Sequence, residues 1–297
     1  MATSTDQLKG SFPPIITPFK DGAIDYDMYA SLVEFQIKQG SHGILVNGTT
    51  SEPSTLTVEE RNKIVDLAAK TNKGRLPMVV ATGSQSLAET VALTDHAVKQ
   101  GADCLLIVTP YYIRPNQRGL IEYYLEVTKK HKTPWMIYHI PGRAAVSITL
   151  DTVKELRERS STFIGMKHAV DNLGFVSKCL DAWPEYKVFV GLEDLSFPMM
   201  CVGAVGLMNA VGNLRPDLMA ELCELVFKGE LKKAQALHMR LFEINEAVFY
   251  DNNPIPMKYM MRKLGIIKKN EHRLPNLPAT PELEQRLDGV LKRAGFI

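Results

Sequence analysis

This 297-residue chain has no long apolar run and little net charge. No apolar stretch approaches the length of a transmembrane helix, and the opening residues MATSTDQLKG contain no apolar signal core. The net charge is only +2, and no basic block or basic-aromatic interleaving is present. These features argue against nucleic acid and membrane partners. We expect a cytoplasmic protein rather than an exported one.

Cysteine is scarce as well, and the histidines follow no metal-binding pattern. The four cysteines lie at unrelated spacings inside apolar segments, which indicates buried thiols in a reducing compartment rather than disulfides or a zinc site. The seven histidines show no HExxH motif or other paired-ligand spacing, so we expect no metal. The cysteines are Cys104, Cys179, Cys201 and Cys223.

Short apolar runs alternate with longer amphipathic segments along most of the chain. Roughly eight strands connected by helices predict a closed α/β barrel, the (β/α)8 or TIM barrel. A doubly wound open sheet would give a similar pattern, but no Gly-rich phosphate loop follows the first strand. The expected strands are Phe12–Thr17, Gly43–Val46, Pro77–Thr82, Cys104–Thr109, Pro134–Tyr138, Phe163–Lys167, Val188–Gly191 and Val205–Asn209.

The C-terminal quarter lacks the strand-helix alternation of the rest of the chain, because no strand is expected after the eighth unit. Glu230–Tyr250, Pro256–Leu264 and Pro281–Ala294 have the pattern of three further helices. We therefore divide the chain into a catalytic barrel, residues 1–227, and a C-terminal helical appendage, residues 228–297.

Lys167 ends the apolar run from Thr162, a segment of strand type. Desolvating an ammonium is costly, so a lysine in a buried strand favours the neutral amine, a nucleophile suited to Schiff-base chemistry. The ordinary alternative is that the strand ends there and the amine points into water. The residues that follow the neighbouring strands help to choose between these two interpretations.

Polar residues follow the other strands at the same end of the predicted barrel, where barrel enzymes place their chemistry. Each alone has an ordinary structural explanation, such as a turn, a core tyrosine or a surface cation. Together they offer a carboxylate anchor, proton-transferring hydroxyls and a cation for an acidic substrate. They are Gly48, Thr49, Thr50, Tyr112, Tyr138 and Arg143.

At these residues the chain resembles the dihydrodipicolinate synthase / N-acetylneuraminate lyase family of class I pyruvate aldolases. The likeness covers essentially the whole chain. It implies a lyase that needs no cofactor and acts on pyruvate and an aldehyde. The motifs that carry it are Gly48–Glu52, Val108–Tyr112, Tyr138–Arg143, Gly165–Lys167 and Asn253–Pro256.

The resemblance implies a role for each matching residue. Lys167 would form the Schiff base with pyruvate, and Tyr138 would donate and accept protons. Thr49 and Tyr112 would complete a proton relay, with Tyr112 reaching in from a neighbouring subunit. The family commonly forms homotetramers built as dimers of dimers.

The resemblance also places the substrate-binding residues. Thr50 would hold the pyruvate carboxylate, and Gly48 and the backbone of Met208 would line that site. Arg143 would receive the second carboxylate, which favours the synthase branch, where pyruvate condenses with aspartate 4-semialdehyde. The direction of reaction is left open.

The chain departs from the synthases at several positions that the resemblance places around the second-substrate pocket. These departures keep open an aldolase or dehydratase acting on another 2-oxo acid, sugar-derived or aromatic. A noncatalytic barrel and a metal-dependent class II aldolase are more distant rivals. Val58 stands where lysine-inhibited members have histidine, so we expect no feedback by lysine. The departures are Ser51, His139, Ala144-Ala145 and His168.

Overall fold

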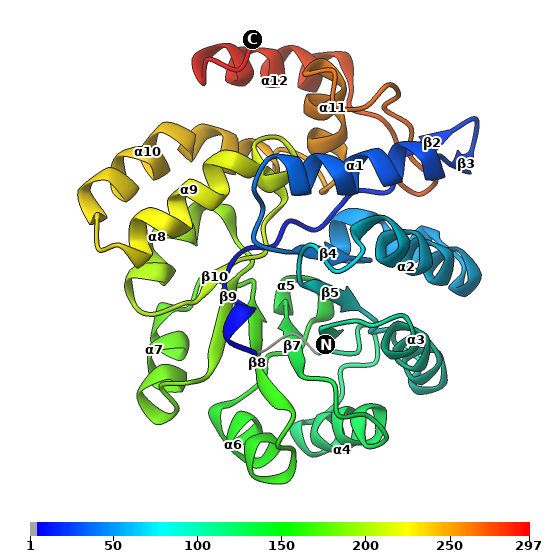
Figure 1. Ribbon diagram of the computed structural model, residues 1–297, viewed down its shortest axis with the longest axis vertical. Coiled ribbons are helices and arrows are strands. Elements are labelled where there is room, and N and C mark those ends of the chain that lie inside the picture. The colour runs from blue at the N-terminus through cyan, green and yellow to red at the C-terminus, as the bar shows by residue number, and fades with distance from the viewer. Residues whose placement is uncertain (1–4) are drawn as a thin grey trace.

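A ring of parallel strands forms the centre of the computed structural model, which describes residues 5–297 (Figure 1). From the second strand of the ring to the last, each strand pairs in parallel with the next along the chain, and the first strand pairs in parallel with the last. The expected α/β barrel is confirmed. Its strands are β1 (Gly10–Ser11), β4 (Ile44–Val46), β5 (Met78–Ala81), β6 (Cys104–Val108), β7 (Trp135–His139), β8 (Phe163–His168), β9 (Lys187–Val190) and β10 (Gly206–Leu207).

The ring closes through a proline-containing segment rather than through a long first strand. β1 lies earlier than the expected Phe12–Thr17, because Pro13 and Pro14 have no N–H to donate to a ladder. Pro13 O accepts a hydrogen bond from Leu45 N at 3.1 Å, and Ile15 N donates to Leu45 O at 3.0 Å. These two bonds flank Pro14 and join the first segment to β4.

Helices cover the outside of the ring, and a small antiparallel hairpin, β2 (Phe19–Lys20) with β3 (Ala23–Ile24), precedes the first of them. Thr57 and Glu60 form a reciprocal capping box at the start of the helix Val58–Asn72. The barrel helices are α1 (Tyr26–Lys38), α2 (Val58–Asn72), α3 (Leu87–Lys99), α4 (Gln117–Thr128), α5 (Pro141–Ala144), α6 (Leu150–Arg159), α7 (Leu173–Ala182), α8 (Ser196–Cys201) and α9 (Pro216–Phe227).

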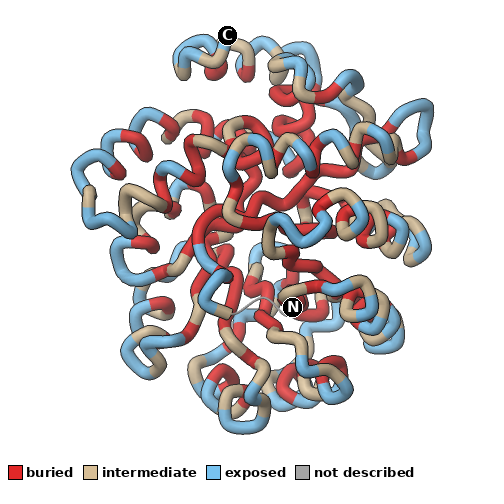
Figure 2. The backbone as a smooth tube through the Cα atoms, in the orientation of Figure 1, coloured by how far each residue is buried: buried red, intermediate tan, exposed pale blue. Residues whose placement is uncertain are grey.

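Buried side chains form two layers, one inside the ring and one between the ring and the helices. Alternate residues of a strand face opposite sides, so each strand contributes to both layers. Met136 and Tyr138 belong to the inner cluster, whereas Ile137 belongs to the outer one. Figure 2 shows the buried backbone concentrated in the centre and the exposed backbone on the outer helices.

The three C-terminal helices are present as expected: α10 (Leu231–Ala247), α11 (Ile255–Lys263) and α12 (Pro281–Arg293). Their buried residues join the outer cluster of the barrel. We keep the division near residue 228 as a proposal, in which residues 228–297 form an appendage that shares the hydrophobic core of the barrel. Among the described residues, no helix combines the length and apolarity needed to cross a bilayer.

The cysteine prediction is right for three residues and wrong for one. Cys104, Cys179 and Cys223 are buried, but Cys201 is exposed. Cys201 is the last residue of the short helix α8, where the chain turns toward solvent.

A buried polar cluster joins the C-terminal helices to the turn after β4. Lys258 Nζ lies 2.5 Å from Glu52 Oε1, and neither side chain is exposed. Asn276 donates a hydrogen bond to the other carboxylate oxygen at 2.9 Å, and His272 Nδ1 lies 3.3 Å from it. Burial by itself raises the pKa of Glu52, but the hydrogen bond from His272 and the charge of Lys258 hold that pKa below its usual range.

We expect Lys258→Met to lower the free energy of unfolding by about 3 kcal/mol, because removing one partner leaves a buried carboxylate without its counter-ion. Chemical denaturation measures the loss. Lys263 lies on the same helix as Lys258 and forms an exposed ion pair with Asp288 of α12, so Lys263→Met is the matched control and should change stability little. The double variant Glu52→Gln/Lys258→Met should recover much of the lost stability. Equal stabilities of Lys258→Met and Lys263→Met would contradict this account.

Candidate active site

Lys167 lies inside the barrel at the carboxyl end of β8, and its side chain is buried rather than directed into water. The residue is 4% exposed, and Nζ lies 4.5 Å from the centre of the Tyr138 ring. Strand pairing sets Lys167 level with Tyr138 of β7 and Phe189 of β9. The amine therefore lines a small chamber of about 40 Å³ rather than the outer surface.

The loop after β9 packs directly against the lysine side chain. A Cβ atom added at Gly191 would lie 2.9 Å from Lys167 Cε and 2.8 Å from Ala169 Cβ. Glycine fits at position 191 because a larger residue would collide with the lysine methylene. The packing of the loop is therefore matched to the Lys167 side chain.

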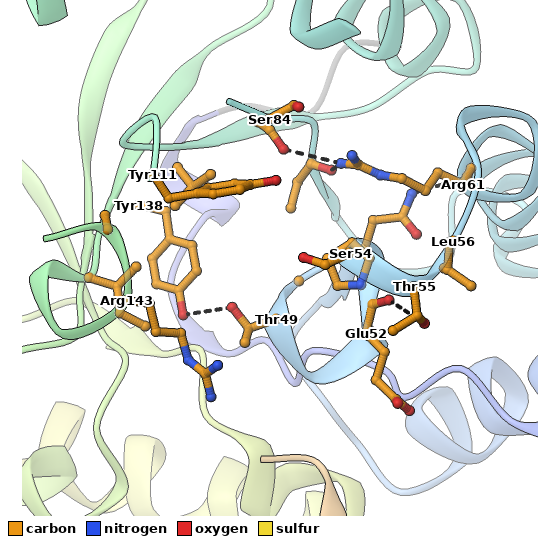
Figure 3. A pocket seen from close by; sticks show the side chains of 18 of the residues that line it. Thr49, Glu52, Ser54, Thr55, Leu56, Arg61, Ser84, Tyr111, Tyr138 and Arg143 are labelled. Atoms are coloured by element: carbon orange, nitrogen blue, oxygen red, sulfur yellow. Dashed lines mark hydrogen bonds between the residues drawn. The ribbon is translucent and has the colours of Figure 1, made fainter. Parts of the chain in front are cut away.

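A hydroxyl pair stands beside the amine. Tyr138 Oη lies 3.2 Å from Thr49 Oγ1, and the two residues face each other across the cavity in Figure 3. Tyr138 comes from β7 and Thr49 from the short 3-10 helix Thr49–Ser51 after β4. Two adjacent hydroxyls can pass a proton in either direction, which imine formation requires.

Thr50 lines the same chamber, and the C-terminal region fixes its orientation. Asn253 Nδ2 donates a hydrogen bond to Thr50 Oγ1 at 3.0 Å. A hydroxyl that accepts one hydrogen bond still has its own hydrogen to donate. The Thr50 hydroxyl is therefore available to a carboxylate in the chamber.

Gly48 has a different role from the one that its sequence context suggests. Gly48 lines the larger cavity rather than the lysine chamber, and its φ of −67° is open to any residue. The left-handed positions of this turn are Asn47 and Glu52, with φ of 57° and 55°. A Cβ at Gly48 would lie 3.1 Å from Pro14 Cβ, so close packing against the first segment explains the glycine.

Arg143 lies at the boundary between the chamber and a larger cavity of about 600 Å³. It belongs to the short helix α5 directly after β7, is exposed, and donates from Nη2 to Asn252 Oδ1 at 2.9 Å. Figure 3 shows its guanidinium on the same side of the cavity as the Tyr138 hydroxyl. Met208 directly follows β10, is fully buried and also lines the chamber.

Tyr112 is not brought into the site by this single chain. It is 88% exposed, with φ of 73°, and it lines neither cavity. Tyr112 lies in the loop between β6 and α4, and its exposed side chain points away from its own barrel. Its expected part in the proton relay stays a proposal that needs a second subunit.

His139 and His168 do not surround the second-substrate pocket, so that expectation is wrong. They follow Tyr138 and Lys167 by one residue, and strand alternation turns them outward toward the helices. Their Nδ1 atoms lie 3.2 Å apart, and Phe175 of α7 stacks on His168. Burial, followed by the charge of His168, lowers the pKa of His139 to about 3, and burial lowers the pKa of His168 to about 4.

The other departures from the synthase pattern divide between packing and cavity lining. Ser51 faces the first segment, with Oγ donating to Ile15 O at 2.5 Å, and it lines neither cavity. Ala144 lines the larger cavity. Ala145 has φ of 57°, a conformation that favours glycine.

Two chamber residues were not predicted as site residues from the sequence. Asn253 is 8% exposed and orients Thr50; it begins one of the motifs that carry the family resemblance, but no role of its own was predicted for it. Glu193 is 1% exposed and lines the chamber with Lys167. Applying the strand-end rule to the seventh strand would find Glu193, since it follows Gly191 by two residues.

A buried lysine amine at the carboxyl end of a parallel barrel, beside a Tyr-Thr hydroxyl pair and a further threonine hydroxyl, indicates a lyase of the Schiff-base class. Comparison with known proteins agrees with this class. The chain belongs to the Dihydrodipicolinate synthetase family, whose model matches residues 7–294.

Relatives with this architecture match over almost their full length. The 4-hydroxy-tetrahydrodipicolinate synthase of Thermus thermophilus is 42% identical over 291 residues, 97% of each chain. The crystal structure of dihydrodipicolinate synthase from Aquifex aeolicus superposes with a TM-score of 0.94 at 36% identity, covering 97% of this chain and 98% of that one. A monomeric dihydrodipicolinate synthase variant, 32% identical, superposes with a TM-score of 0.94 and covers 98% of both chains.

Gly191→Ala tests the packing around the nucleophile. An added methyl group in a packed core costs about 1–3 kcal/mol, so we expect imine formation with pyruvate to slow roughly 5- to 150-fold. Borohydride trapping followed by intact mass measures the rate. Gly142→Ala, where an added Cβ meets nothing within 4 Å, is the control; equal slowing in both variants would refute the steric explanation.

Proposed function

We propose that the enzyme condenses pyruvate with aspartate 4-semialdehyde through an imine on Lys167, the activity of a 4-hydroxy-tetrahydrodipicolinate synthase. The observation that carries the proposal is the buried Lys167 amine beside the Tyr138–Thr49 hydroxyl pair. The names of the full-length relatives support the substrate assignment.

The chemistry begins with attack of the neutral Lys167 amine on the carbonyl carbon of pyruvate. Tyr138, through Thr49, supplies the proton that the oxygen needs to leave as water. The resulting protonated imine withdraws electrons from C3, which loses a proton to give an enamine. The enamine attacks the aldehyde carbon, and the new carbon–carbon bond forms between C3 and that carbon while the carbon–oxygen π bond breaks and the oxygen takes up a proton. The amino group of the aldehyde substrate then attacks the imine carbon and displaces Lys167 as the free amine.

The substrate carboxylates are held by different parts of the site. Thr50, with its hydroxyl oriented by Asn253, is placed to donate to the pyruvate carboxylate. Arg143 is placed to receive the carboxylate of the aldehyde at the mouth of the chamber. Its hydrogen bond to Asn252 holds the guanidinium over that mouth before substrate arrives.

The oligomeric state and the cellular location are further parts of the proposal. The exposed neighbours Tyr112 and Ile113, 88% and 60% exposed, support contact with a second copy in a homotetramer built as a dimer of dimers. A related monomeric variant exists, so the tetramer is tested by the mass of the assembly in solution. The free thiols support a reducing, cytoplasmic location.

Borohydride with pyruvate should attach one pyruvate unit to the wild-type chain, and Lys167→Ala should abolish the adduct. The reason is that only a primary amine forms the reducible imine. Lys178→Ala, which removes an exposed lysine of α7, is the control and should label as the wild type does. Undiminished labelling of Lys167→Ala would reject Lys167 as the nucleophile.

Arg143→Ala should raise KM for aspartate 4-semialdehyde about 10- to 150-fold, because charge-assisted hydrogen bonds contribute about 1.5–3 kcal/mol. A coupled assay with the next reductase of the pathway measures it. Trapping of the pyruvate imine should be unchanged, which separates the two substrate positions. Turnover of sugar-derived or aromatic acceptors in preference to aspartate 4-semialdehyde would instead assign another 2-oxo acid aldolase.

A further inference from the structure

Glu193 is a buried carboxyl group in the lysine chamber that the reaction described above does not use. It lies in the short 3-10 helix Glu193–Leu195 that follows β9. Oε1 accepts a hydrogen bond from Ala210 N at 2.5 Å. Oε2 is buried and has no hydrogen-bond partner among the described residues. A carboxyl oxygen of this kind is costly unless something else compensates it.

The loop that carries Glu193 is the one that packs on Lys167. Gly191, two residues earlier, allows the lysine methylene to pass within van der Waals distance. Lys167 and Glu193 then line the same chamber of about 40 Å³. Burial raises the pKa of Glu193 and the charge of Lys167 opposes that rise, so the two side chains interact across this small space.

The charges around Glu193 are unevenly distributed. Lys167, Arg143 and Tyr138 line the chamber with Glu193, which is the acidic residue of the chamber lining. Outside, the neighbouring Asp194 is exposed, and the nearby His238 of α10 is buried with its pKa lowered by burial. Ser196 and Asn209, bonded to each other, add no charge.

We infer that Glu193 is the counter-ion of the positive charge that Lys167 carries as a protonated imine, and so is a positioning residue of the reaction. The inference rests on the imine on Lys167 proposed above. A protonated imine is a desolvated cation, and a carboxylate at close range favours the charged form over the neutral imine. Because only the protonated form withdraws electrons effectively from C3, the carboxylate prolongs the reactive state.

The protonation of Glu193 sets the pH range in which this support operates. Burial raises its pKa to about 7, against the opposing effects of the Ala210 hydrogen bond and the charge of Lys167. Below that pH the carboxyl is neutral and gives no electrostatic support. Above it the carboxylate stabilises the imine cation and extends the protonated imine to higher pH. The contribution of Glu193 therefore appears on the alkaline side alone.

A purely structural role makes a different prediction. Glu193 could serve only to accept the Ala210 N–H and fix the segment after β10. Glu193→Gln keeps an acceptor for that N–H and removes the charge, so a structural role would leave the pH profile unchanged. The neutral substitution therefore separates the two roles.

The experiment measures the yield of reduced pyruvate adduct with cyanoborohydride, by intact mass, between pH 5.5 and 9. Wild type and Glu193→Gln should agree at pH 5.5. At pH 8.5 the variant should yield about tenfold less, equivalent to a shift of the alkaline limb by about one pH unit. Asp194→Asn, the exposed neighbour, is the matched control and should follow the wild-type profile.

The outcomes separate this inference from the proposed function. Superimposed profiles of wild type and Glu193→Gln, or an equal loss at every pH, would overturn the role of Glu193 while the imine still forms. No adduct in the wild type at any pH would overturn the proposed function itself. Thermal unfolding checks the fold of the variant, and Glu193→Met, of similar length and uncharged, provides a second neutral variant with the same expected profile.

Discussion

The parallel pairing of β7 with β8 is the constraint on which the site depends. It sets Tyr138 level with Lys167, and strand alternation turns both side chains into the barrel. A slip of one residue would send His139 and His168 inward and turn the amine toward the helices. The histidine pair, packed on Phe175 and bonded through its ring nitrogens, helps to hold this register from the outer side. The nucleophile, its phenol and the space around them thus follow from one strand pairing.

The second requirement is a fixed turn after β4, and the C-terminal helices provide it. Asn253 orients Thr50, and Lys258 neutralises Glu52 two residues further along the chain. Left-handed backbone at Asn47 and Glu52 makes the turn compact, while its contacts come from residues more than 200 positions away. The C-terminal region therefore shapes the lysine chamber, because it orients the hydroxyl that we propose binds the pyruvate carboxylate.

Electrostatics joins these parts. The chamber brings together an amine that becomes a cationic imine and a guanidinium that binds an anion. Water is largely excluded, so each charge has to be balanced within the protein or by substrate. In the function proposed here, the carboxylate of the aldehyde balances Arg143, and Glu193 balances the charge of the imine.

Local features of the chain determined the alternation of strands and helices, the three C-terminal helices and the strand-end position of Lys167, since apolar periodicity and capping are short-range signals. They also indicated the polar residues at the barrel's carboxyl end. Tertiary structure decided which of them meet. It turned His139 and His168 away from the cavity, left Tyr112 exposed, gave Gly48 a packing role and brought in Asn253 and Glu193. The direction of a side chain depends on strand register and closure, and those are fixed by contacts between residues distant in sequence.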